Sequence, residues 1–109
     1  MSRGIFAELR ALLRPERLLA DPDADGRGVR LCVVDTGVQV AALRERHPRA
    51  TLADAVVFRE DRPEALPDPG TPSSPHGTTV ADIILRVAPA VTLYSANVFG
   101  PLGTCEART

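Results

Sequence analysis

The sequence has no tryptophan, and aromatic side chains make up only 4% of its 109 residues. Surfaces that stack the bases of single-stranded nucleic acids depend on such side chains, so their scarcity argues against this kind of binding. The net charge of −1 gives no electrostatic attraction toward nucleic acid or an anionic membrane surface. We therefore predict no nucleic-acid partner and no membrane partner.

Long hydrophobic runs and a cysteine framework are also missing. No stretch approaches the roughly 20 apolar residues that a membrane span needs, and charged residues interrupt the amino-terminal segment, so no secretory signal is predicted. Two cysteines do not make a disulfide framework. We interpret Cys32, which lies in an apolar run, as a small core residue and Cys105 as a free thiol. These absences favour a cytoplasmic protein with one small domain.

Residues 1–25 are predicted to form an amino-terminal helical segment followed by an acidic linker. Apolar residues at helical spacing predict a helix over about 3–13 and a short second turn over 15–19. We interpret the first helix as a surface helix that docks its apolar stripe; the alternative is an interaction helix for a partner. Asp21, Asp23 and Asp25 resemble the opening of a calcium loop, but its closing glutamate would fall at Cys32, which favours a linker.

The remainder, residues 26–109, is predicted to be an α/β domain. The expected order is a buried strand over 29–34, a helix over 40–46, a strand over 55–58, an exposed and mobile loop over 59–75, a helix from 76 to 88, and a strand over 91–98. Pro89 ends the long helix. Strands that alternate with helices in this way predict part of a parallel sheet.

Asp35 and His76 are the candidate catalytic residues. Asp35 follows an apolar strand, and the carboxyl ends of strands in open α/β sheets are where ligands and catalytic groups collect. His76 stands at the start of the long helix, so the two side chains can meet over the sheet. An aspartate that orients an imidazole is the base half of a Ser-His-Asp triad.

Four motifs around these residues resemble those of the subtilisin-like serine proteases (subtilases). Residues 26–38, GRGVRLCVVDTGV, are similar to that family's aspartate motif, and 76–81, HGTTVA, to its histidine motif. Residues 87–94 resemble its Val-Ala-Pro turn and the strand that follows, and His47-Pro48 resembles its frequent His-Pro pair. The resemblance covers about residues 26–100. It implies a partial three-layer α/β/α parallel sheet, with Asp35 as the triad aspartate, His76 as the general base and His47 as a helix-end residue.

The sequence departs from the subtilase pattern at the nucleophile. Neither the serine motif Gly-Thr-Ser-Met-Ala nor the oxyanion-hole asparagine is present, and Asn97 does not match the latter. Ser73 and Ser74 lie in the proline-rich loop and are not interpreted as nucleophiles. We therefore expect a fragment or truncated form of an endopeptidase domain, and we expect it to be inactive alone. It would act on a peptide or protein substrate only when a carboxyl-terminal segment completes it.

Two further departures concern packing and metals. Asp82 stands where the family has a glycine, so we expect it either to disturb close packing or to face solvent. Arg44 stands in the region where some members supply a calcium carboxylate, which argues against that site. We predict no cofactor and no metal.

The sequence also allows three other interpretations. A second chain, or self-association, could pair with an exposed sheet edge. The chain could be a catalytically silent interaction module that uses its amino-terminal helix. It could also be half of a retroviral-type aspartic protease, in which two copies of Asp35 share a proton.

Overall fold

The computed structural model describes residues 3–12, 14–59 and 63–99. Its helices and strands, in chain order, are α1 (Arg3–Leu12), α2 (Pro15–Ala20), β1 (Arg30–Asp35), α3 (Val40–Arg46), β2 (Thr51–Val57), β3 (Leu66–Pro67), α4 (His76–Val87) and β4 (Thr92–Asn97). No helix in these ranges is long and apolar enough to cross a membrane. The α/β class predicted from the sequence is confirmed.

The sheet has four strands in the order β1-β4-β2-β3. Strands β1, β4 and β2 are parallel, and the short β3 is antiparallel to β2. Asp35 at the end of β1 pairs in register with Asn97 at the end of β4, which in turn pairs with Val57 of β2. The three parallel strands therefore end at the same edge of the sheet, and α4 begins at that edge.

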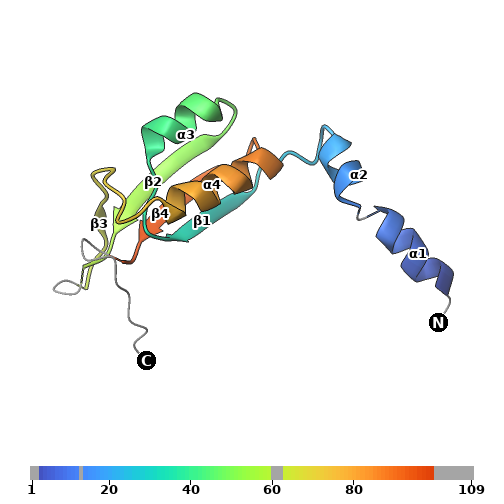
Figure 1. Cartoon of the computed structure of the whole chain (residues 1–109), viewed down its shortest axis with the longest axis horizontal. Coiled ribbons are helices and arrows are strands. Elements are labelled where there is room, and N and C mark those ends of the chain that lie inside the picture. Colours follow the sequence, from blue (N-terminus) through green and yellow to red (C-terminus); the bar gives the residue numbers. More distant parts are fainter. Residues whose placement is uncertain (1–2, 13, 60–62, 100–109) are drawn as a thin grey trace.

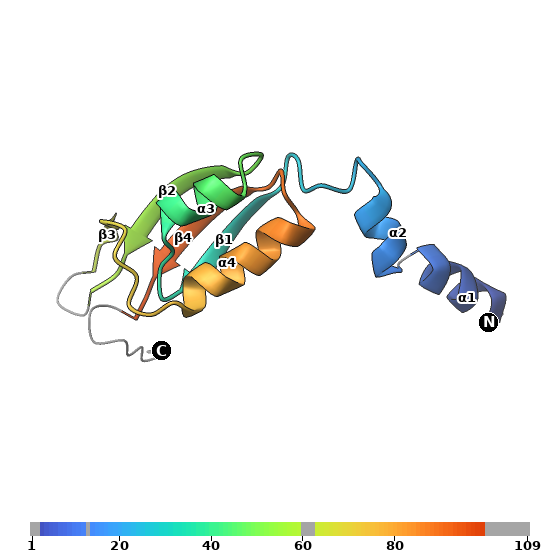
Figure 2. The same cartoon turned by 45° about the horizontal axis from the view of Figure 1, so that its top comes forward.

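Helices α3 and α4 cover one face of this sheet (Figures 1 and 2). Helices α1 and α2 project away from the sheet and do not cover its second face (Figure 1). Within the described residues the domain thus has two layers, and the second helical layer of the expected α/β/α arrangement is not formed.

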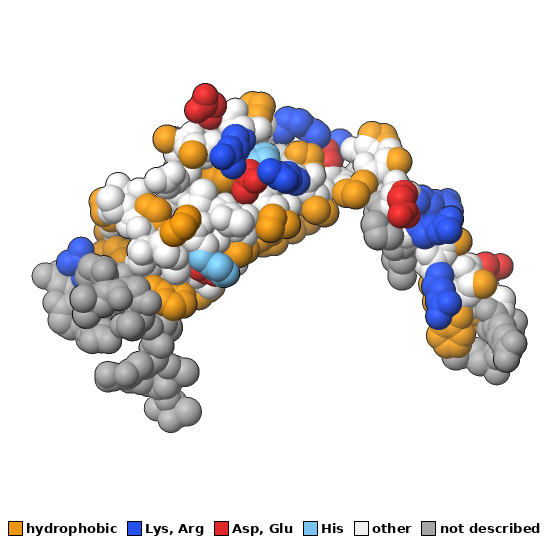
Figure 3. Space-filling view, viewed as in Figure 1, with side chains coloured by type: hydrophobic (Ala, Val, Ile, Leu, Met, Phe, Trp, Pro, Cys, Tyr) orange, Lys and Arg blue, Asp and Glu red, His pale blue; other side chains and the backbone are white. Residues whose placement is uncertain are grey.

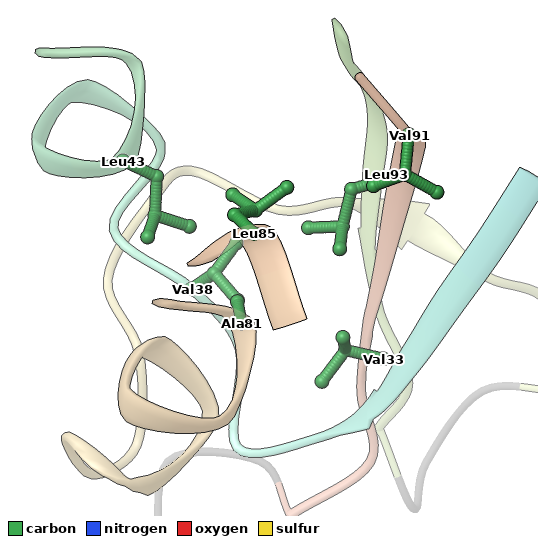
Figure 4. Packing of buried hydrophobic residues seen from close by; sticks show 7 residues of the cluster. All are labelled: Val33, Val38, Leu43, Ala81, Leu85, Val91 and Leu93. Carbon is green, nitrogen blue, oxygen red and sulfur yellow. The ribbon is translucent and has the colours of Figure 1, made fainter. Parts of the chain in front are cut away.

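The hydrophobic core lies between the two covering helices and the inner face of the sheet (Figure 4). Residues spaced by four along α4, Ala81 and Leu85, are fully buried because this spacing places them on one side of a helix. They pack in one cluster with buried residues from α3, the strands and the connections: Val33, Val38, Leu43, Val91 and Leu93.

Prolines lie at both ends of α4, and Pro89 follows its end as predicted from the sequence. Pro75 immediately precedes it with φ −72° and ψ −6°, a conformation that the proline ring already favours. Ala88 leaves the helical region at φ −126°, and its N–H still donates to the carbonyl of Ile84 at 2.8 Å. The helix stops there because the residue before a proline is disfavoured in the helical conformation.

The interpretation of β1 as a buried strand with Cys32 in the core is wrong. Cys32 is exposed, and Val34 on the same face is 63% exposed. Alternate residues of a strand point to opposite faces, so the buried Val33 and the partly buried Leu31 face the core side. Because the helices cover one face only, the other side chains of the apolar run stay accessible. Cys105 lies outside the described residues.

Two other elements differ from expectation. Strand β2 begins at Thr51 and not at Ala55, and the segment predicted as a loop contains β3, where Leu66 pairs with Val57. The apolar stripe of α1 was expected to dock, but its large side chains remain about half exposed: Ile5, Phe6, Leu9 and Leu12. That interpretation is wrong for this structure.

We predict that Leu85→Ala lowers the free energy of unfolding by about 3 kcal/mol, because it leaves a cavity at a fully buried position. The matched control is Ile83→Ala on the same helix, where the side chain is 56% exposed and a change within about 0.5 kcal/mol is expected. Urea unfolding monitored by circular dichroism measures both variants. Equal losses in the two would contradict the core described here.

Candidate active site

Asp35 and His76 meet at the carboxyl edge of the sheet. The Nδ1 atom of His76 lies 2.9 Å from each carboxylate oxygen of Asp35. A carboxylate can only accept hydrogen bonds, so Nδ1 carries the proton and Nε2 is left as the basic nitrogen. The Asp35 side chain is 17% exposed, whereas that of His76 is 69% exposed. The aspartate is therefore fixed within the fold, and the imidazole it holds is open to solvent.

The environment of Asp35 keeps its carboxylate ionised. Partial burial is the largest influence and acts to raise its pKa, but the hydrogen bonds from His76 and from the backbone and side chain of Thr36, with the charge of His76, together outweigh it. The Thr36 N–H donates to Oδ1 at 2.7 Å. As a result the pKa of Asp35 lies below its usual value, and the group is an anion at neutral pH.

Thr36 and Gly77 join the end of β1 to the start of α4. The Thr36 hydroxyl donates to the carbonyl of Ser74 at 3.1 Å and accepts the backbone N–H of Gly77 at 2.9 Å. Gly77 is buried, and a Cβ at this position would overlap the carbonyl oxygen of Gly37. A residue without a side chain is therefore required for the helix to approach closely enough to bring His76 to Asp35.

The segment before His76 is also anchored to the sheet edge. The Ser73 N–H donates to the carbonyl of Thr36 at 2.8 Å, and the amide of Asn97 donates to the Ser73 hydroxyl at 3.2 Å. The hydroxyl of Ser74 accepts the backbone N–H of His76 at 3.3 Å. The Ser73 hydroxyl is thus engaged with the Asn97 side chain and the Ser74 hydroxyl with the backbone of α4; that neither is a nucleophile stays a prediction. Ser95 is buried at 3% exposure, so it does not reach the open side of His76 either.

His47 lies away from this pair, at the end of α3. Its Nε2 atom contacts Oδ1 of Asp82 on α4 at 2.7 Å. Arg46 and Arg86 also approach this carboxylate, at 3.3 and 3.0 Å. The hydrogen bond to His47 is the main reason that the pKa of Asp82 lies below its usual value. Asp82 thus neither disturbs the packing nor faces solvent: it joins α3 to α4.

Sequence reasoning did not find this contact. Asp82 and Arg86 pair because they stand four residues apart on one helix, which is a local relation. The approach of His47 depends on how α3 packs on α4.

Asp25 is likewise a structural residue and not an exposed linker carboxylate. It is buried, and its side chain accepts hydrogen bonds from Arg27 at 3.0 Å and Arg49 at 2.5 Å. The bonds from Arg27 hold the pKa of Asp25 well below its usual range. Within residues 3–12, 14–59 and 63–99, no three acidic, histidine or cysteine side chains are grouped so as to hold a metal ion. The region of Arg44 and the acidic segment with Asp21, Asp23 and Asp25 both lie within these ranges.

No protein-family model matches the chain, and a search of curated proteins finds no match. The site is therefore defined by its own geometry. It is an ionised aspartate that orients a histidine at the carboxyl edge of a parallel sheet, with the second ring nitrogen open.

We predict that Gly77→Ala lowers the free energy of unfolding by about 3 kcal/mol, because the added methyl group forces α4 away from the carbonyl of Gly37. Val87→Ala on the exposed side of the same helix controls for the effect of alanine itself and should change stability by no more than about 0.5 kcal/mol. Chemical denaturation provides the measurement. A Gly77→Ala protein of unchanged stability would show that the close approach is not required.

A second prediction concerns acid pH. Because the folded-state pKa of Asp35 is lowered, its contribution to stability is complete above the usual aspartate value of about 3.9 and is lost as the pH falls below it. The stability difference between the wild-type protein and Asp35→Asn should therefore be largest near neutral pH and shrink toward pH ~3. Thermal melts over this pH range test this, and a difference independent of pH would contradict it.

Proposed function

We propose that residues 26–99 carry the aspartate–histidine half of a subtilisin-like serine endopeptidase site. The observation that carries this proposal is the contact of His76 Nδ1 with Asp35 while Nε2 stays open. In this arrangement Asp35 holds the tautomer and stabilises the imidazolium that forms when Nε2 takes a proton from a serine hydroxyl. His76 then returns that proton to the leaving amine.

The motifs around the site support the same proposal. The residues that bring α4 to β1, Thr36 and Gly77, belong to the two segments that resemble the subtilase aspartate and histidine motifs. The 109 residues contain no Gly-Thr-Ser-Met-Ala motif. The nucleophile and the oxyanion hole would therefore have to come from sequence outside them, and a peptide or protein substrate would bind only to the completed site.

The aspartic protease alternative does not fit the structure. Residues 33–38 resemble the catalytic turn of retroviral-type proteases, but those proteases require an all-β fold. Here two helices pack on a mainly parallel sheet, and the partner of Asp35 is a histidine of the same chain. A silent interaction module remains the second candidate, favoured by the exposed apolar stripe of α1.

The proposal is tested by co-expressing the chain with the carboxyl-terminal part of a subtilisin-like protease that carries the serine motif and the oxyanion asparagine. We expect no fluorophosphonate labelling of the 109-residue chain alone and peptide hydrolysis by the pair. Asp35→Asn should lower the rate of hydrolysis by about 10⁴-fold, and His76→Ala by a similar factor, because each removes the oriented base.

The control is His47→Gln, which alters the other histidine and should retain hydrolysis if circular dichroism shows that the chain is folded. Hydrolysis that persists in His76→Ala would overturn the proposed function. The interaction module would be favoured by a different result. In that case no pair hydrolyses the peptide, and the folded Asp35→Asn and His76→Ala proteins bind a partner as the wild type does.

A further inference from the structure

Asn97 is a buried polar residue at the carboxyl edge of the sheet, next to the candidate site. It is the last residue of β4, is 3% exposed, and pairs in register with Asp35 at the end of β1. Because residues paired across two strands point to the same face, its side chain stands beside the Asp35 carboxylate. A buried amide in this place has to be hydrogen-bonded, and its partners show what it holds.

The carboxamide of Asn97 contacts two different segments. Its oxygen, Oδ1, accepts the backbone N–H of Phe99 at 3.1 Å, which fixes the orientation of the amide because an N–H needs an acceptor. Its nitrogen, Nδ2, donates to the Ser73 hydroxyl at 3.2 Å, and Oδ1 lies 3.4 Å from the same hydroxyl. A side chain of β4 thus holds the segment that leads into α4.

The amide also packs against the turn that follows β1. Gly37 in this turn has φ +88°, and a Cβ at this position would lie 3.1 Å from Nδ2 of Asn97. The absence of a side chain therefore leaves the space that the amide needs. Asn97 thus touches both connections that carry the candidate pair, namely the turn after Asp35 and the segment before His76.

Contacts from the end of β1 and from β4 together hold the segment before His76. The carbonyl of Thr36 accepts the Ser73 N–H at 2.8 Å, and the Asn97 amide holds the Ser73 side chain. His76 follows three residues later as the first residue of α4. Its imidazole is 69% exposed, so the position of its backbone, and not packing around the ring, decides whether Nδ1 reaches Asp35. Figure 3 shows histidine surface, in pale blue, open to solvent.

We propose that Asn97 is a positioning residue that keeps the imidazole of His76 in the Nδ1–H tautomer. It acts through Ser73 and not by contact with the ring. The contacts of Nδ1 with Asp35, at 2.9 Å, require the backbone at position 76 to be held, since hydrogen bonds weaken steeply as their geometry changes. An exposed imidazole that has lost this acceptor takes both tautomers, because water bonds to either nitrogen. The inference depends on the contact of Asp35 with His76 and not on the proposed function.

A role confined to the turn after β4 accounts for fewer of these contacts. Such a role needs only Oδ1 of Asn97, which accepts the Phe99 N–H. It does not explain why Nδ2 contacts Ser73 or why Gly37 leaves room for the amide. An aspartate or a serine at this position would close the turn as well.

The test measures the tautomer directly. Nitrogen-15 NMR of the 109-residue chain, at about pH 9 where imidazoles are neutral, distinguishes a protonated from an unprotonated ring nitrogen, and the His76 signals are assigned by their loss in His76→Ala. We expect the ratio of the Nδ1–H to the Nε2–H form to fall at least about threefold in Asn97→Ala, the effect of about one net hydrogen bond. Ser73→Ala removes the same bond from its other end and should give a similar fall, and the double variant should give no further one.

The matched control is Ser95→Ala. Ser95 lies two residues before Asn97 on the same face of β4 and is likewise 3% exposed. Its hydroxyl has no hydrogen-bond partner among the residues that the structure describes, so its removal should leave the tautomer ratio of His76 unchanged.

A fall in Asn97→Ala and Ser73→Ala, but not in Ser95→Ala, supports the positioning role. An unchanged ratio in a folded Asn97→Ala protein, equal falls in all three variants, or a fall that Ser73→Ala does not share overturns it. If circular dichroism shows that Asn97→Ala is unfolded, Ser73→Ala decides: a fall supports the inference and an unchanged ratio overturns it. Tautomer ratios as expected, without hydrolysis by the completed pair, would refute only the proposed function.

Discussion

The close approach of α4 to the end of β1 is the constraint on which the candidate site depends. It is possible because position 77 has no side chain to meet the carbonyl of Gly37, and it is held by the Thr36 hydroxyl, which bonds to Ser74 and Gly77. These contacts satisfy a backbone N–H at the start of α4 that has no partner within the helix. They also place the first residue of α4 against the last residue of β1, where the imidazole meets the carboxylate.

The carboxylates of Asp82 and Asp25 connect the elements that surround this contact. The carboxylate of Asp82 forms a hydrogen bond with His47 at the end of α3 and ion pairs with Arg46 and Arg86. These contacts join α3 to α4 on the side away from β1. Asp25 forms ion pairs with Arg27 and Arg49. They connect the segment before β1 with the segment between α3 and β2. Both groups have lowered pKa values because cationic or donor groups surround them. Acidic residues that resemble a metal site or a solvated surface in the sequence thus act in packing.

The covering of the sheet from one side explains the distribution of exposed apolar residues. Helices α3 and α4 bury Val33 and Leu93, while Val34 on the opposite face and Ile83 on the outer side of α4 remain accessible. Buried apolar area is the main stabilising contribution to a small domain, so this chain gains less of it than a sheet covered on both faces. The uncovered outer face of β1 ends at Asp35, so exposed apolar surface borders the candidate site.

The sequence alone determined the α/β class, the extent of α4 and the candidate pair, because periodicity, prolines and motif order are local properties of the chain. It did not determine that Cys32 is exposed, that α1 stays undocked or that Asp82 binds His47. Each of these depends on which surfaces another element covers, and no local pattern records that. Only the tertiary structure showed that Asp35 and His76 are in contact, since Gly77 and Thr36 act across a separation of 41 residues.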